Sequence, residues 1–317
     1  MTISDNVREP AMKDPTIELQ GISKWFDSFV AVNDVSVQVY PGITGLLGPN
    51  GSGKTTLLRM IAGLSNPSAG QVKLFDEPVR GNPSIYRRIG VLPEHETAYG
   101  FYTGRQLVEL AAQLYGLNPT GPPVDRAIEA VGLTDARNQD VGTYSRGMRQ
   151  RIRMAAALVH EPEVLLLDEP LNGMDPRQRL ETQNLLKCLA DKGCTILISS
   201  HILEEVETLA ERLVLMVSGK LAASGNLRAI REKLDKRPYR IRIVADNPRT
   251  LASALIQSDV VDSVAVAPDG TMVVLSSQVA ILQQSVPQLA RNLGIRLFRV
   301  EPLDESLESV FSYVVDR

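Results

Sequence analysis

The sequence predicts an α/β fold for residues 16–230, and two apolar runs support this most directly. The runs "EVLLLD" (163–168) and "CTILISS" (194–200) are short, continuous and bounded by polar or Gly residues, which is typical of strands buried in a parallel sheet. Helical patterns lie before and between them, and such alternation favours an α/β architecture. With 317 residues, the chain is expected to form two domains.

The composition is that of an ordinary globular protein. Hydrophobic residues make up 44% of the chain and charged residues 22%, with a net charge of −3. Nucleic-acid-binding domains are usually basic, so we expect no nucleic-acid partner. The two cysteines, Cys188 and Cys194, favour a reduced compartment. No apolar run approaches the roughly 20 residues that span a bilayer, so we expect a cytoplasmic protein that reaches a membrane only through a partner.

Other segments complete the expected organisation. Residues 1–15 are polar and are expected to form a flexible tail. Short β-rich runs extend from Ile17 to Leu47, and helical patterns dominate from Thr103 to His160. The first of these helices is expected to bury one face, formed by Leu107, Leu110, Ala111 and Leu114.

A second domain is expected at the C-terminal end. The charged stretch 231–238 is the expected linker, and residues 239–317 then follow the order strand, helix, strand, strand, helix, strand. The two middle strands form a predicted hairpin about Asp269-Gly270, and the second helix is expected at "VPQLARNLG". This order predicts a small ferredoxin-like α/β domain, with a final helix at "DESLESVFSYVV".

The stretch "GPNGSGKTT" (48–56) matches the phosphate-binding loop G-x-x-x-x-G-K-[ST]. It follows the apolar run "ITGLL" and precedes a helical pattern, so backbone N–H groups and a helix N-terminus can converge on phosphate oxygens. Lys54 is expected to reach the β- and γ-phosphates, and the Thr55 hydroxyl to bind Mg²⁺. The loop residues expected to hold a nucleoside triphosphate are Gly48, Pro49, Asn50, Gly51, Ser52, Gly53, Lys54, Thr55 and Thr56.

Small-molecule kinases, GTPases and motor ATPases all share such a loop. Two carboxylates in this sequence help to distinguish among these enzymes. The apolar run "VLLLDEP" (164–170) ends in Asp168 and Glu169. Asp168 is placed to hold Mg²⁺, and Glu169 to orient or deprotonate the water that attacks the γ-phosphorus. A kinase would reserve that place for its acceptor substrate, so the second carboxylate favours hydrolysis.

With "YSRGMRQR" before these carboxylates, residues 16–230 resemble the ATP-binding subunit of an ABC transporter. The resemblance implies a RecA-like P-loop NTPase core with a β-subdomain and a helical subdomain at about residues 95–160. In that family the signature, usually LSGGQ, touches the γ-phosphate bound to the opposite subunit. It maps here onto residues 144–148, where Ser145 and Gly147 are the expected nucleotide contacts.

Three further motifs occur in the family's order. The stretch "LNGMDP" (171–176) resembles the D-loop, which carries Asp175 across the dimer interface. The stretch "SSHILEEVE" resembles the switch region, whose His201 hydrogen-bonds the γ-phosphate. The stretch "SKWFDSFVAV" resembles the segment whose aromatic ring stacks on adenine, and its spacing selects Phe26 rather than Trp25.

The signature segment is rich in arginine, with Arg146, Arg149, Arg151 and Arg153 within eight residues. The resemblance places them on the helix after the signature, where they mark a dimer-facing ATP contact. The alternatives are a solvated charged helix face and a nucleic-acid patch.

Two positions depart from the family pattern. The glutamine of the Q-loop is Glu94 here; its carboxylate can meet Mg²⁺ or water but cannot donate a hydrogen bond. The third signature residue, usually Gly, is Arg146. Both differences concern the rate of hydrolysis more than ATP binding. The same motifs resemble the ABC type-2 exporters, in which a separate membrane permease selects the cargo.

The chain contains one phosphate-binding loop, so the resemblance implies a dimer. Lys54 and Glu169 of one chain would face Ser145 of the other across ATP, and closure of the dimer would power an exporter. A soluble ABC ATPase of translation or DNA repair, and a low-turnover regulatory subunit, are the alternatives. The aromatic cluster formed by Tyr99, Phe101 and Tyr102 is expected either to dock the permease or to pack on the helical subdomain.

Overall fold

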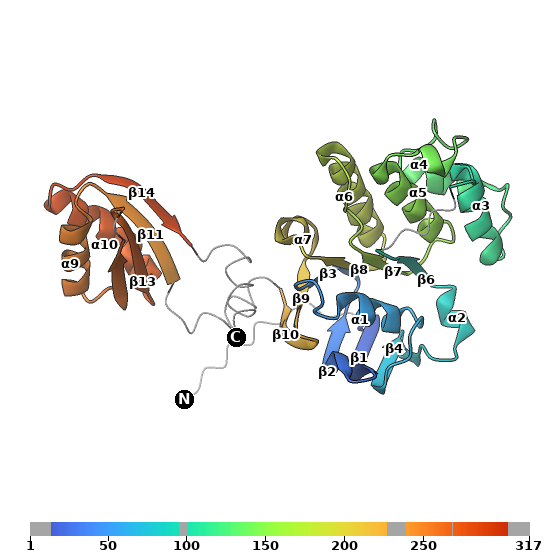
Figure 1. Ribbon diagram of the computed structural model, residues 1–317, viewed down its shortest axis with the longest axis horizontal. Helices are drawn as coiled ribbons and strands as arrows, with labels where there is room; N and C mark the ends of the chain where they lie inside the picture. The colour runs from blue at the N-terminus through green and yellow to red at the C-terminus, as the bar shows by residue number, and fades with distance from the viewer. Residues whose placement is uncertain (1–13, 95–99, 227–238, 268, 304–317) are drawn as a thin grey trace, which may run out of the picture. The chain divides into compact units, whose positions relative to one another are not determined.

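The chain forms two compact units, Met1–Ser224 and Gly225–Arg317 (Figure 1). The computed structural model describes residues 14–94, 100–226, 239–267 and 269–303. Most of the expected tail, the linker, Tyr99 and the final helix lie outside these described residues. Among the helices described, none is both long and apolar enough to cross a bilayer.

A six-stranded sheet forms the centre of the first unit, in the order β10-β9-β3-β8-β7-β6. Strands β6, β7, β8, β3 and β9 pair in parallel. The two apolar runs form β7 and β8, as the sequence predicts. The strands are β3 (Gly42–Leu47), β6 (Ile89–Leu92), β7 (Val164–Asp168), β8 (Thr195–Ser200), β9 (Arg212–Val217) and β10 (Lys220–Gly225).

An antiparallel sheet and helix α1 (Lys54–Ile61) cover one face of the central sheet (Figure 1). The side chains of Leu57 and Ile61 on α1 pack with Leu166 and Leu197 of the parallel strands in one buried cluster. The antiparallel strands, in the order β2-β1-β4-β5, are β1 (Ile17–Phe26), β2 (Phe29–Val39), β4 (Ala69–Leu74) and β5 (Glu77–Pro78). A short helix, α2 (Pro83–Tyr86), precedes β6.

Helices cover the opposite face. Leu165, Leu167, Ile196 and Ile198, which alternate with the residues of the first cluster, lie in a second buried cluster on this side. Both faces of β7 and β8 are therefore buried. The helices on this side are α3 (Gly104–Leu114), α4 (Pro122–Ala130), η1 (Val141–Thr143), α5 (Arg146–Leu158), α6 (Pro176–Asp191) and α7 (Leu203–Leu209). Of these, α5, α6 and α7 make the main contacts with the strands, and α3 and α4 pack on α5.

The expected buried face of α3 is wrong in part. The residues of α3 that are buried are Gly104, Val108 and Ala112, at spacings of four, and Leu114 is 80% exposed. Only Leu107 and Ala111 of the expected face pack against the core. Small side chains line the close contact with the neighbouring helices, and the larger leucines lie beside it.

The second unit follows the strand and helix order that the sequence predicts. Its antiparallel sheet has the order β12-β13-β11-β14. Helix α10 begins at Val279, seven residues before the expected start at Val286. The expected start was wrong because Pro287, a residue that usually lies in the first turn of a helix, lies inside this one. The elements are β11 (Tyr239–Ala245), α9 (Pro248–Gln257), β12 (Ser263–Val266), β13 (Thr271–Ser276), α10 (Val279–Asn292) and β14 (Leu297–Pro302).

We predict that Leu167→Ala lowers the free energy of unfolding of the first unit by ~2–5 kcal/mol, because it leaves a cavity under the helical layer. Leu114→Ala is the matched control, since it removes the same atoms from an exposed position, and we expect a change below ~0.5 kcal/mol. Denaturant titration followed by circular dichroism measures both. Equal losses in the two variants would contradict the described packing.

Candidate nucleotide site

The phosphate-binding loop has a backbone shape that requires glycine. It connects β3 to α1, and the N-cap residue Gly53 has a φ of 98°. A Cβ atom on Gly53 would lie 2.5 Å from the carbonyl oxygen of Ala31, and one on Gly48 would lie 2.4 Å from that of Met216. Larger residues at these positions would push the loop away from its neighbours, so the glycines keep the cradle closely packed.

Lys54 lies within this cradle. Its Nζ donates hydrogen bonds to the carbonyl oxygens of Gly48 at 2.7 Å and Pro49 at 3.2 Å. Burial lowers the pKa of Lys54, while the negative charges of Glu169, Asp168 and Glu94 act in the opposite direction. The carboxylates therefore favour a charged ammonium group beside the loop.

The residues of the loop fit a triphosphate. Ser52 Oγ is buried and has no hydrogen-bond partner among the described residues, so it is available to a phosphate oxygen. Helix α1 begins at Lys54 and directs the partial positive charge of its N-terminus toward the same place. Thr55 lies one residue further along, while Asp168 ends the buried strand β7. A hydroxyl and a carboxylate are oxygen ligands of the kind Mg²⁺ prefers.

Glu169 follows Asp168 in a strained conformation. Its φ of 50° is in the left-handed region, which costs a non-glycine residue roughly 1–2 kcal/mol. Ser199 at the end of β8 supports both carboxylate residues. Its Oγ donates to Asp168 Oδ1 and accepts from the backbone N–H of Glu169 at 3.1 Å. Because of this left-handed backbone, the side chains of Asp168 and Glu169 point in different directions although the two residues are adjacent.

The side chain of Glu169 contacts His201. His201 Nδ1 lies 2.9 Å from Glu169 Oε1. Burial raises the pKa of Glu169, and the hydrogen bond to His201 lowers it. Lys54, Asp168, Glu169 and His201 are therefore brought together at the carboxyl edge of the sheet. A cation, two carboxylates and an imidazole in this arrangement can hold a phosphate and activate a water molecule.

The signature and D-loop residues form a second group. Ser145 is exposed and caps α5, where its Oγ accepts from Met148 N at 3.2 Å. Asp175 caps α6 by accepting from Gln178 N at 2.9 Å. A Cβ atom on Gly147 would lie 2.0 Å from Gln178 Oε1, so glycine permits this close packing. The two helix N-termini are thereby held side by side.

Arg146 lies against the D-loop of its own chain. A Cβ atom on Gly173 would lie 2.4 Å from Arg146 Cδ, so the arginine stem covers that glycine. The large residue at the third signature position therefore packs along the loop that follows Glu169.

The expectation that the arginine cluster marks a dimer-facing contact is wrong for Arg151. That side chain is buried, and its Nη1 donates to the carbonyl oxygen of Val131 at 3.1 Å. Arg149 and Arg153 also donate to backbone carbonyl oxygens of their own chain. These cations hold α5 to the surrounding loops. The spacing of charges in the sequence is the same for such bonded arginines and for a solvated helix face, so it did not distinguish the two.

Phe26 is the last residue of β1, and Glu94 follows β6. Phe26 is 50% exposed and Trp25 is 47% exposed, so exposure does not show which of the two aromatic rings would stack on adenine. Lys24 Nζ lies 5.0 Å from the Phe26 ring centroid. Glu94 is exposed just after β6, within electrostatic range of Lys54.

Sequence reasoning missed two supporting residues, Ser199 and Gln150. Ser199 bonds both acidic residues, and Gln150 Nε2 donates to the carbonyl oxygen of Glu169 at 3.4 Å. The polar end of the apolar run "CTILISS" was the available signal for Ser199. No local pattern marks Gln150, because its partner is nineteen residues away in the sequence.

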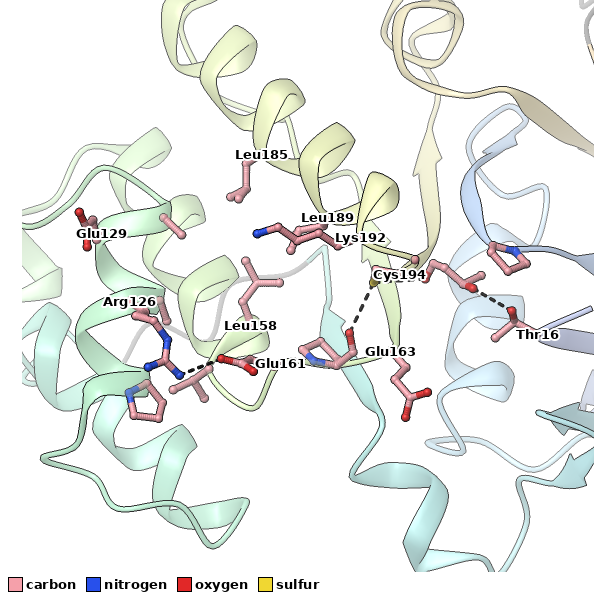
Figure 2. A pocket seen from close by; sticks show the side chains of 18 of the residues that line it. Thr16, Arg126, Glu129, Leu158, Glu161, Glu163, Leu185, Leu189, Lys192 and Cys194 are labelled. Atoms are coloured by element: carbon pink, nitrogen blue, oxygen red, sulfur yellow. Dashed lines mark hydrogen bonds and ion pairs between the residues drawn. The ribbon is translucent and has the colours of Figure 1, made fainter. Parts of the chain in front are cut away.

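A cavity of about 900 Å³ lies apart from these residues (Figure 2). Its lining includes Pro41, Glu163 and Cys194, which precede β3, β7 and β8, so it opens at the amino ends of the strands. The phosphate-binding loop follows the carboxyl end of β3 at the other edge. Burial raises the pKa of the Cys194 thiol to about 12, so this thiol is not a reactive nucleophile.

Comparison with known proteins identifies the family. Residues 32–172 match the ABC transporter family. The bacitracin transport ATP-binding protein BcrA of Enterococcus faecalis is 33% identical over 306 residues, which cover 94% of this chain and 96% of that protein. The chain belongs to the ABC transporter ATP-binding proteins. It is an ATP-binding subunit with an ABC ATPase domain.

Other relatives and solved structures agree with this membership. The daunorubicin/doxorubicin resistance ATP-binding protein DrrA of Streptomyces peucetius is 32% identical, covering 93% of this chain and 91% of the relative. A solved ATP-binding subunit of an ABC transporter has a TM-score of 0.64 at 27% identity, covering 69% of this chain and 93% of that one. A dimeric bacterial ABC cassette shares the fold, with a TM-score of 0.62 at 23% identity, covering 67% of this chain and 99% of that one.

We predict that Lys54→Ala weakens ATP binding by about tenfold or more, because a charge-assisted contact with the phosphates is lost. Isothermal titration calorimetry measures the affinity. Lys187→Ala removes the same charge from an exposed position on α6 and serves as the control, with unchanged affinity expected. Equal ATP affinity in the Lys54 variant and the wild type would contradict the assignment.

Proposed function

We propose that this subunit powers export of a substrate through a separate membrane permease. Two copies would close around ATP, and hydrolysis would let them separate. The arrangement of Lys54, Glu169 and His201 at one edge of the sheet gives the main support. Transport and drug-resistance relatives that align over nearly the whole chain favour an exporter over a soluble ATPase of translation or DNA repair.

Each residue at the sheet edge has a proposed role. Lys54 and the backbone N–H groups of the loop bind the β- and γ-phosphates, and Thr55, Asp168 and Glu94 hold Mg²⁺ directly or through water. Bound Mg²⁺ would neutralise phosphate charge. Glu169 orients the attacking water and accepts its proton.

Two other side chains, His201 and Phe26, also have proposed roles. His201 holds the Glu169 carboxylate and contacts the γ-phosphate. The exposed ring of Phe26 stacks on adenine. The raised pKa of Glu169 suits a general base, because a more basic carboxylate accepts a proton more readily.

The second nucleotide contact would come from another copy. Ser145 and Asp175 are exposed ends of two adjacent helices, and Gly147 allows their close packing. In the proposed dimer this surface faces the phosphate-binding loop of the partner, so each ATP is held between chains. The dimeric cassette of the same fold provides a precedent for such pairing.

Docking of the permease is proposed near the segment after Glu94. Phe101 is 73% exposed, and its ring centroid lies 4.6 Å from that of Tyr102. A pair of large rings at the surface of the helical subdomain can anchor a short helix of a membrane subunit. The exposure of Phe101 favours docking over packing as a satellite core. The third expected member, Tyr99, lies outside the described residues.

A low-turnover regulatory subunit is the second candidate. The carboxylate of Glu94 adds negative charge near Lys54, which could slow hydrolysis without preventing ATP binding. Steady-state turnover of the purified full chain distinguishes the two functions.

We predict that Glu169→Gln abolishes ATP turnover, with a rate at least ~100-fold below that of the wild type, because the amide cannot accept the proton of water. ATP affinity stays within about twofold, since the phosphate-binding loop is intact. Release of phosphate and calorimetric binding are measured on the same preparation. Glu161→Gln, at an exposed position after α5, is the control with normal turnover. Wild-type turnover in the Glu169 variant would refute the role of that residue.

We also predict that Ser145 acts on the ATP of the partner chain. A mixed dimer of one Lys54→Ala chain and one Ser145→Arg chain places both defects in one site and leaves the other whole. It should therefore bind one ATP per dimer, while the homodimer of either variant loses both intact sites. Binding by the mixed dimer at the level of the homodimers would show that the head-to-tail arrangement is wrong.

A further inference from the structure

Two side chains of α5 connect the backbone after β6 to the backbone of Glu169. Arg153 donates to the carbonyl oxygen of Pro93, and its Nη1 donates to Gln150 Oε1 at 3.0 Å. Gln150 Nε2 then donates to the carbonyl oxygen of Glu169 at 3.4 Å. We call these two residues the Arg153–Gln150 relay. Pro93 directly precedes Glu94, so the relay joins two segments that carry acidic residues of the site.

The bond to Glu169 supports a strained residue. Glu169 has a left-handed backbone, and its N–H group is bonded to Ser199. Its carbonyl oxygen accepts from Asn172 N at 3.2 Å and from Gln150. Such a conformation persists only when surrounding bonds determine it, so each bond affects where the carboxylate points.

Burial makes Gln150 sensitive to its partners. The residue is 7% exposed, and its amide uses the oxygen for Arg153 and the nitrogen for Glu169. An amide flip would place like groups together at both ends, so Arg153 determines the orientation in which Gln150 can donate to Glu169. The distance of 3.4 Å is near the limit of a hydrogen bond, so a small shift of Gln150 breaks it.

We propose that Arg153 and Gln150 are positioning residues that orient Glu169 according to the position of the segment at Pro93 and Glu94. The proposal rests on the proposed role of Glu169 in hydrolysis. Movement of that segment would be transmitted through Arg153 to the amide of Gln150, and from there to the backbone of Glu169. Hydrolysis would then depend on the state of a segment next to the proposed docking surface for the permease.

Arg153→Ala in the full chain tests the relay. We expect kcat for ATP to fall about tenfold, with KM and ATP affinity within about twofold and an unchanged unfolding temperature, because the variant misplaces Glu169 but leaves the phosphate-binding loop intact. Arg153→Lys keeps the positive charge and one donor nitrogen in place of the two that Arg153 uses, so it should recover part of the rate. Arg126→Ala removes an exposed arginine of α4 and should have wild-type kcat.

A double-mutant cycle with Gln150→Leu separates a relay from independent effects. If the two residues act in series, Arg153→Ala lowers kcat by less than about twofold in the Gln150→Leu background. Multiplicative losses, a wild-type kcat in Arg153→Ala, or a loss of ATP binding equal to the loss of kcat would overturn the relay. A wild-type chain without turnover would refute the proposed function itself, which distinguishes the two failures.

Discussion

Parallel pairing of β3, β7 and β8 is the constraint on which the nucleotide site depends. The register places Leu47 opposite Ser200 and Asp168 opposite Ser199, so the three strands end at one level. The segments that follow therefore meet, although Lys54 is more than 100 residues from both Asp168 and His201 in the sequence. Burial of both sheet faces fixes that register, because a slip of one residue would exchange the side chains of the two apolar clusters.

Hydrogen bonds at this edge of the sheet determine how the acidic residues after β7 are oriented. Ser199 is bonded to the carboxylate of Asp168 and to the backbone N–H of Glu169, so it holds the left-handed backbone of Glu169 next to Asp168. From the helical side, Gln150 bonds the carbonyl oxygen of the same residue. The central sheet and the helical subdomain thus both determine the position of Glu169. A movement of α5 relative to the sheet would therefore change the bond between Gln150 and this residue.

Local patterns predicted the parts of the molecule that local chemistry determines. Lys54 and the glycines of the phosphate-binding loop were predictable because they all lie in one short stretch of sequence. Periodicity identified α3 but could not show which side its neighbours cover, so Leu114 was assigned to the core. Pro287 concealed the first half of α10, since proline more often begins a helix than lies within it. Gln150 was not predictable, because its role depends on a carbonyl oxygen brought near only by the fold.

The oligomeric state with nucleotide tests the central claim, that two chains share each ATP, most directly. Native mass spectrometry of the full chain can be recorded with Mg²⁺ and a slowly hydrolysed ATP analogue. We expect a dimer carrying two nucleotides, with monomer predominating when the nucleotide is ADP. A single chain carrying one nucleotide at saturating analogue would contradict the shared site, because Ser145 could then not reach the phosphate of a partner.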